Sequence, residues 1–228
     1  MELVKGNTLT EVWESWYNKL STQGKDDSSR DGAVCGEFLN AVTILKDPTQ
    51  NILKSDIRKL PMRYAVGELL WYLSGSNSLD DIKRYSKAWE NLSDDGYTVN
   101  SAYGYRIQSK FGFNQWEHVI NLLTKDPNSR QAVIHIKDAS DEPTKDLPCT
   151  VCLQYLIRDG KLHATTYMRS NDIWLGFPYD VFSFTCLQII MAFELGVDIG
   201  EYTHIAGSLH LYSRNKQNAT QSDAKGHM

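Results

Sequence analysis

The chain has 228 residues, of which 41% are hydrophobic and 23% are charged, and its formal net charge is −4. This length is enough to bury one large core, so we predict a single domain over residues 1–228, with 216–228 as a short tail. Lysine and arginine are scattered along the chain, which excludes the electrostatic footprint of a protein that binds polymeric nucleic acid. Local arginines could still hold a small anion.

No apolar run approaches the ~20 residues that a membrane span needs, and the first residues, MELVKGNTLTEVWESW, lack the apolar segment of a signal peptide. We therefore expect a cytoplasmic protein with no membrane partner. In a reducing compartment, Cys35, Cys149, Cys152 and Cys186 are expected to be free thiols. Cys149 and Cys152 have a spacing found in zinc sites, but no second ligand pair follows, so we expect no metal.

Two helices are predicted in the first half of the chain. Hydrophobic residues at helical spacing predict one over 9–20, and an apolar run predicts a buried one over 62–73 that ends at Ser74-Gly75. Glu68 lies inside the second run. A carboxylate there would have a raised pKa unless it were paired, so Glu68 is either an acid–base group or a residue that reaches an arginine or a helix edge. The segment alone favours neither.

The second half mixes helices and strands. The predicted elements are, in order, a helix ending at Leu123, a turn at 126–128, a strand over 132–136, a β-hairpin over 151–167 with Asp159-Gly160 between its halves, a long helix over 179–195 closed by Gly196, and a strand over 203–214. This mixed order predicts an α+β fold with a mixed β-sheet packed with helices.

One cysteine lies near a candidate cation. Cys149 follows Pro148 at the start of the predicted hairpin, and Arg169 lies at the end of the returning strand. Neighbouring cations favour the thiolate that a nucleophilic cysteine needs. Most buried cysteines are nevertheless inert packing residues, so these residues alone leave both interpretations open. His204 matches no motif and is expected to be a packing or surface residue.

A longer stretch around Cys149 is more specific. The segment PCTVCLQYLIRDGKLHATTYMRSNDIWLGFPYDVFSF resembles the thymidylate synthase signature, with Pro-Cys, a following Gln, a hairpin, Arg-Ser-x-Asp and Leu-Gly-x-Pro. The upstream blocks GELLWYLSGSNSLDDI, AWENL, SAYGYRI and DPNSRQAV match that family in order, as does GSLHLYSRN downstream. The resemblance covers 30–214. It implies a thymidylate synthase-like fold, a sheet-mediated homodimer and an enzyme that uses 5,10-methylenetetrahydrofolate as co-substrate.

The resemblance also implies roles for individual residues. Cys149 corresponds to the nucleophile that adds to C6 of a pyrimidine nucleotide, and Glu68 to a buried carboxylate that relays protons. The expected catalytic residues are Cys149, Glu68, Asp180, Tyr103 and Asp172. The expected nucleotide ligands are Arg30, Arg130, Arg169, Ser170, Gln154, His210 and Tyr212, of which Arg130 comes from the partner subunit. Trp89 and Asp172 are expected on the cofactor side.

Asp180 departs from the family, which has an asparagine there whose amide recognises uracil. Uracil presents an acceptor at C4 and a donor at N3, whereas cytosine presents the reverse. An ionised Asp180 accepts from the cytosine amino group, and a carboxylic proton shared with N3 completes the pair. With uracil, an ionised Asp180 would face the O4 acceptor and lack a donor there, at a cost of ~1–3 kcal/mol or more when buried. Asp180 therefore predicts a cytosine base.

The deoxycytidylate hydroxymethylase branch of the family carries the same change. Thr150 after the cysteine, and the blocks QYLIRDGK, MRSND and NSAYG, are also similar to that branch. Its enzymes put a hydroxymethyl group on C5, because water and not hydride quenches the exocyclic methylene intermediate. Only KQNATQSDAKGHM follows Asn215, in place of the long segment that excludes water in thymidylate synthases. The final GHM could be a remnant of cloning.

We therefore predict hydroxymethylation of dCMP, favoured over CMP and dUMP, to the 5-hydroxymethyl nucleotide. Gln131 replaces the second arginine of the phosphate loop, and Leu92 stands where an aromatic often occurs, which weakens the expected phosphate and folate contacts.

The alternatives are methylation of dUMP or dCMP, and a non-catalytic relative that holds a nucleotide or RNA. Cys149, Glu68 and Asp180, together with Arg169, argue against the last. The sequence leaves open ribose or deoxyribose, and hydroxymethyl or methyl product.

Overall fold

The computed structural model describes residues 1–28, 34–141 and 143–216, and these build one mixed β-sheet. Eight strands of the described chain follow the order β1-β3-β8-β6-β5-β4, with β2 beside β3 and β7 beside β8. The pairs β1–β3, β6–β8 and β7–β8 are parallel, and the others are antiparallel. The strands are β1 (Glu2–Gly6), β2 (Lys25–Ser28), β3 (Val34–Leu45), β4 (Val133–His135), β5 (Thr150–Arg158), β6 (Lys161–Met168), β7 (Asn171–Asp172) and β8 (Asp198–Tyr212).

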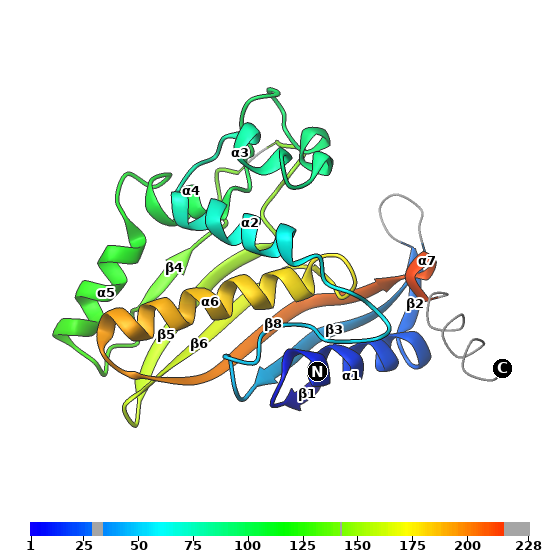
Figure 1. Cartoon of the computed structure of the whole chain (residues 1–228), viewed down its shortest axis with the longest axis horizontal. Helices are drawn as coiled ribbons and strands as arrows, with labels where there is room; N and C mark the ends of the chain where they lie inside the picture. The colour runs from blue at the N-terminus through cyan, green and yellow to red at the C-terminus, as the bar shows by residue number, and fades with distance from the viewer. Residues whose placement is uncertain (29–33, 142, 217–228) are drawn as a thin grey trace.

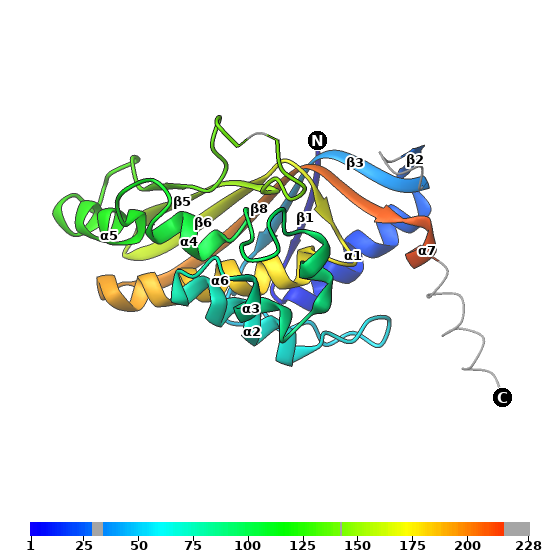
Figure 2. The same cartoon turned by 90° about the horizontal axis from the view of Figure 1, so that it is seen from above.

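The long helices lie on one face of this sheet (Figure 1). α1 (Leu9–Thr22) and α6 (Phe177–Leu195) pack directly on the strands, and α2 (Met62–Ser74) packs on α6. Seen from above, the three helices share one side of the sheet (Figure 2). The other described helices are α3 (Leu79–Lys83), the 3₁₀ helix η1 (Lys87–Asn91), α4 (Tyr103–Gln108), α5 (Gln115–Lys125) and α7 (Ser213–Lys216). No helix in the described chain combines the length and apolar character needed to cross a membrane.

Two tryptophans attach α1 to the sheet. Trp13 and Trp16 are fully buried. The indole N–H of Trp13 donates to the Ile173 carbonyl at 2.7 Å, and that of Trp16 donates to Thr43 Oγ1 at 2.7 Å. Each indole therefore buries its ring without leaving its polar atom unpaired. Both lie in the core.

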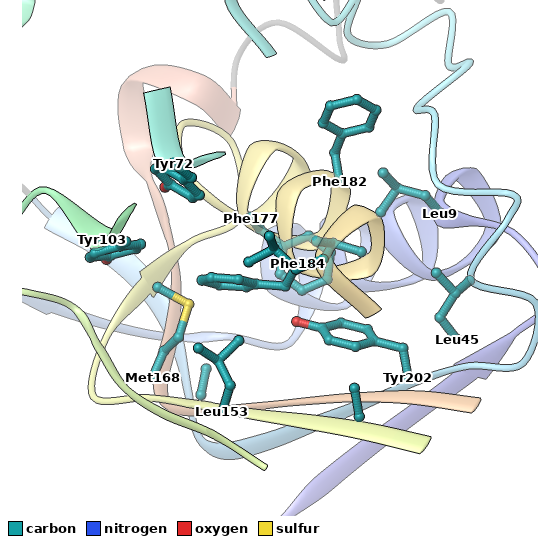
Figure 3. Packing of buried hydrophobic residues seen from close by; sticks show 14 of the residues in the cluster. Leu9, Leu45, Tyr72, Tyr103, Leu153, Met168, Phe177, Phe182, Phe184 and Tyr202 are labelled. Atoms are coloured by element: carbon teal, nitrogen blue, oxygen red, sulfur yellow. The ribbon is translucent and has the colours of Figure 1, made fainter. Parts of the chain in front are cut away.

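The core between α6 and the sheet positions the first turn of α6. Phe177 and Phe184 project from α6 toward Met168 and Tyr202 of the sheet (Figure 3). Phe177 is completely buried at the first residue of the helix. Because this end of the helix is held against the strands, the side chain of Asp180, one turn later, has a fixed position.

The predicted elements are found with shifted boundaries. The hairpin turn has positive φ at both Asp159 (51°) and Gly160 (73°), which is the type I′ geometry that an Asp-Gly pair favours. α6 begins at Phe177, two residues before the prediction, because Pro178 is tolerated in a first helical turn. β8 begins at Asp198, five residues before the prediction. β3 was not predicted, and its interruption by Gly36 and Asn40 obscured its alternation.

A buried ion pair supports the segment that carries α4. Arg106 is fully buried, and its guanidinium donates to both carboxylate oxygens of Asp141 at 2.7 and 2.8 Å. It also donates to the Ile136 carbonyl and to both the backbone and the side-chain oxygen of Asn100. Since every donor of the fork has an acceptor, the charge is compensated despite its burial.

Replacing Asp141 by alanine should destabilise the protein by about 3–5 kcal/mol, because the buried Arg106 charge would lose its partner. The measurement is urea unfolding followed by circular dichroism. Asp80→Ala, which removes the partner of Lys83 in an exposed pair, should leave the midpoint almost unchanged. Equal shifts in the two variants would contradict this account of the core.

Candidate active site

A pocket of about 590 Å³ opens where α2, the start of β5, β7, the first turn of α6 and the end of β8 meet. The residues expected at the site that line it are Glu68, Trp89, Tyr103, Cys149, Arg169, Ser170, Asp172, Asp180, His210 and Tyr212. Of the described residues expected there, Arg130 and Gln154 do not line it. Arg30 and the tail beyond Lys216 lie outside the described residues. The structure therefore gathers most of the expected side chains around one cavity.

Arg169 holds the loop that carries Cys149. Its backbone N–H donates to the Cys149 carbonyl at 2.8 Å, and its guanidinium donates to the carbonyls of Pro148 at 3.1 Å and Leu147 at 3.0 Å. A guanidinium has five N–H donors, so these side-chain bonds use only two of them. Arg169 can therefore fix the half-buried thiol in the pocket and still present donors to an anion.

Glu68 is paired with a tyrosine. The Tyr64 hydroxyl donates to Glu68 Oε1 at 2.8 Å, and the Trp89 indole N–H donates to that hydroxyl at 3.1 Å. Burial and, to a smaller extent, the nearby Asp180 carboxyl raise the pKa of Glu68 to about 8, and the Tyr64 bond opposes the rise. No arginine of the described chain forms an ion pair with Glu68. Of the two alternatives, the geometry favours an acid–base group.

Asp180 lies at the first turn of α6 and bonds to β7. The Asn171 side-chain amide donates to Asp180 Oδ2 at 2.7 Å. Burial raises the pKa of Asp180 to about 7, and the bond from Asn171 opposes that rise. A Cβ added at Gly176 would lie 3.1 Å from both Asn171 Nδ2 and Asp180 Oδ2. A side chain at this glycine of the Leu-Gly-x-Pro motif would therefore crowd the contact between Asn171 and Asp180.

The two carboxylate oxygens of Asp172 differ in their hydrogen bonds. Its Oδ1 accepts the backbone N–H groups of Trp174 at 2.7 Å and Leu175 at 3.0 Å. Its Oδ2 is buried and has no hydrogen-bond partner among the described residues. Leu175 also lines the pocket, as do Trp89 and Leu92. An unpaired acceptor and apolar side chains in one pocket suit a flat heteroaromatic ring that carries an N–H donor.

The thymidylate synthase family model matches residues 11–225 of this chain. This chain belongs to the thymidylate synthase family. A relative, the deoxyuridylate hydroxymethyltransferase of Bacillus phage SP01, is 34% identical over 227 residues, which cover 93% of this chain and 59% of the relative. The chain thus spans only 59% of the length of that phage protein.

A solved structure confirms the expected fold. Thermostable thymidylate synthase A from Bacillus subtilis superposes with a TM-score of 0.78 at 23% sequence identity, covering 94% of this chain and 83% of that one. The mixed sheet packed with helices is therefore the thymidylate synthase fold. Within the described residues, no cluster of three or more His, Cys, Asp or Glu side chains could hold a metal ion.

The structure adds pocket residues that the sequence did not indicate. Tyr64, one helical turn before Glu68, could have been found from the i, i+4 spacing. Asn171 and Asp146 could not, because their partners lie on other elements. Asp146 accepts a short hydrogen bond from Ser101, and burial raises the pKa of this carboxyl. It is a further titratable group on the pocket wall.

The Tyr64 bond to Glu68 can be tested by titration. Tyr64→Phe should raise the pKa of Glu68 above its value of about 8, because the hydroxyl stabilises the ionised carboxylate. The measurement is carbon-13 NMR of glutamate-labelled protein, with Glu68→Gln to assign the signal. Tyr155→Phe removes another buried tyrosine hydroxyl, away from this pocket, and should leave the titration unchanged.

The raised pKa of Glu68 also makes the stability of the protein depend on pH. The folded protein binds the Glu68 proton more tightly than the unfolded chain does, so the free energy of unfolding should fall as pH rises from about 4 to about 8. Glu68→Gln should remove this part of the pH dependence. A Glu68 titration midpoint below about 5 would contradict both expectations.

Proposed function

We propose that this chain transfers a one-carbon unit from 5,10-methylenetetrahydrofolate to C5 of dCMP and releases 5-hydroxymethyl-dCMP. The observation that carries the choice of base is the half-buried carboxyl of Asp180, which stands where the family has an asparagine and has a pKa of about 7. A carboxyl that gains and loses a proton near neutral pH can accept from the cytosine amino group and share its proton with N3.

The proposed chemistry uses three side chains of the pocket. Sγ of Cys149 bonds to C6 of the pyrimidine, which makes C5 a carbon nucleophile, and the proton that Asp180 shares with N3 neutralises the charge that develops on the ring. Glu68, held by Tyr64, takes up and releases a proton within the pocket. Arg169 and Ser170 bind the phosphate, and His210 and Tyr212 bind the sugar hydroxyl.

The pocket also suits the folate. The unpaired Asp172 Oδ2 would accept from a pterin N–H group, and the side chains of Trp89 and Leu92 would cover its ring. The folate supplies the one-carbon unit at the oxidation level of formaldehyde. Release of a hydroxymethyl product needs only water as the final reactant, whereas a methyl product needs hydride.

A second candidate is hydroxymethylation of dUMP. The phage relative is named a deoxyuridylate hydroxymethyltransferase. A neutral Asp180 could donate to O4 of uracil and accept from its N3–H, so a pKa near 7 is compatible with this base as well. The two bases thus place different demands on Asp180, which donates its proton to N3 of cytosine but to O4 of uracil.

Tritium release from C5-labelled dCMP and dUMP, each with methylenetetrahydrofolate, distinguishes the two candidates. The wild-type protein should release tritium mainly from dCMP, and mass spectrometry should find a hydroxymethyl product. Asp180→Asn should lower kcat/KM for dCMP by ~100-fold and raise it for dUMP, because an amide suits uracil. Cys149→Ser should abolish release from both.

Release from dUMP alone, with a hydroxymethyl product, would establish the second candidate. A methyl product would mean that hydride and not water completes the reaction. Nucleotide binding without any tritium release would support a non-catalytic relative.

We further propose a homodimer through the sheet face opposite α1 and α6. Val42, Ile205, Tyr167 and Cys152 are consecutive partners across four strands and are half-buried or exposed in the single chain. Such a row on an uncovered sheet face is suited to a second copy of the chain. Arg130 is exposed and outside its own pocket, as expected for a residue that binds the phosphate held by the partner.

Mixing two inactive variants tests this arrangement. Cys149→Ser and Arg130→Ala should each have little activity alone. After subunit exchange, a mixed dimer would contain one site with both residues intact, so about a quarter of wild-type activity should return. No recovery, or a monomeric mass by light scattering, would contradict the dimer.

A further inference from the structure

One carboxyl on the pocket wall has no part in the proposed chemistry. Asp146 lines the same pocket as Cys149 and stands three residues before it in the sequence. The Arg169 guanidinium donates to the carbonyls of Leu147 and Pro148, the two residues between them. The arginine that fixes the thiol therefore also fixes the backbone next to this carboxyl.

Contacts from the segment before α4 orient Asp146. The Ser101 hydroxyl donates a short hydrogen bond to Asp146 Oδ2. The Asn100 side-chain amide donates to the Asp146 carbonyl at 3.4 Å, and the Asp146 N–H donates to Thr144 Oγ1 at 3.4 Å. Ser101 is buried, and Asn100 is itself held by the buried Arg106. The carboxyl group is therefore held through both its side chain and its backbone.

The other carboxylate oxygen of Asp146 is available to a ligand. Oδ1 accepts no hydrogen bond from the described residues, and these residues do not enclose it. Asp146 also forms no ion pair with a lysine or arginine of the described chain. A water molecule in the pocket can therefore donate a hydrogen bond to Oδ1.

The electrostatic surroundings of Asp146 suit a general base. Burial raises the pKa of its carboxyl, which makes it a stronger base than an exposed aspartate. The Ser101 hydrogen bond and the charges of Arg106 and Arg169 oppose this rise in pKa, and so favour the ionised form that can accept a proton. Glu68, with a pKa of about 8, is mostly protonated at neutral pH and must lose its proton before it can act as a base.

A hydroxymethyl product requires a base at one further step. Water must lose a proton when its oxygen adds to the exocyclic methylene carbon. Four carboxyl groups line the pocket, and three of them, Glu68, Asp172 and Asp180, are assigned to proton transfer, the folate and the pyrimidine base. Asp146 is the fourth, and its unpaired oxygen suits the remaining task.

We propose that Asp146 is the catalytic base of this hydration step, with Oδ1 holding the water that adds to the methylene carbon. The proposal rests on the proposed function in one respect, that water completes the reaction. As the water oxygen bonds to the exocyclic carbon, its proton moves to Asp146 Oδ1. The π electron pair of the exocyclic double bond moves into the ring and then expels the Cys149 thiolate from C6, which releases the product.

Capture by a thiol measures this step separately from the earlier ones. 2-Mercaptoethanol adds to the same methylene carbon as water and gives a thioether product. The full chain is incubated with C5-tritiated dCMP, methylenetetrahydrofolate and 2-mercaptoethanol, and tritium release and both products are measured, the products by mass spectrometry. Asp146→Asn should retain tritium release and lower the ratio of hydroxymethyl to thioether product by ~100-fold, because the water loses its general base.

Two further variants complete the comparison. Asp94 is exposed and is not among the described residues that line this pocket, but it accepts from the Thr144 hydroxyl and the Lys145 N–H. Asp94→Asn therefore removes a carboxylate that holds the same segment without removing the proposed base, and should retain the wild-type product ratio. Asp146→Ala should lower the ratio as Asp146→Asn does, which keeps the test decisive if Asp146→Asn fails to fold.

The outcomes separate this proposal from the proposed function. An unchanged product ratio in Asp146→Asn and Asp146→Ala would overturn the role of Asp146, as would an equal fall in Asp94→Asn. Loss of tritium release together with the product would also overturn it, because Asp146 would then act before the methylene intermediate forms. A wild type that hydroxymethylates only dUMP would overturn the choice of dCMP, but the lowered ratio would still be expected with dUMP. A methyl product from the wild type would overturn both.

Discussion

Two carboxyl groups share one desolvated pocket, and the proposed chemistry depends on this burial. Removing Glu68 and Asp180 from water raises the pKa of each, and the charge of Asp180 contributes to the shift of Glu68. Like charges at short range do not ionise together easily. The pair can therefore hold a proton near neutral pH, which suits a site that moves protons to and from a pyrimidine ring.

The fold supplies this burial by stacking two helices on a sheet. Glu68 comes from α2 and Asp180 from the first turn of α6, and α2 packs on α6 while α6 packs on the strands. Tyr64 and Tyr179 make an edge-on contact with ring centroids 4.8 Å apart, which links the two helices at the pocket. The residues that set the proton affinity of the site thus lie on the pocket wall, where the two helices meet.

Local signals in the sequence were enough to predict much of the fold. Gly75 and Gly196 mark the ends of two helices at positive φ, and Asp159-Gly160 marks the hairpin turn. The resemblance also indicated the residues that line the pocket. The hydrogen-bond contacts of the buried His204 with Asn171 and Tyr202 could not be predicted, because the folded sheet creates them. Its sequence neighbours indicate only a residue on a strand.

The central claim is that Cys149 attacks a cytosine that Asp180 recognises, and covalent trapping tests it most directly. Fluorine at C5 cannot leave as a cation, so 5-fluoro-dCMP with methylenetetrahydrofolate should remain attached to the enzyme. Intact-protein mass spectrometry should show the adduct, and peptide mapping should place it on Cys149. An adduct formed only with 5-fluoro-dUMP, or on Cys152 or Cys186, would contradict the account.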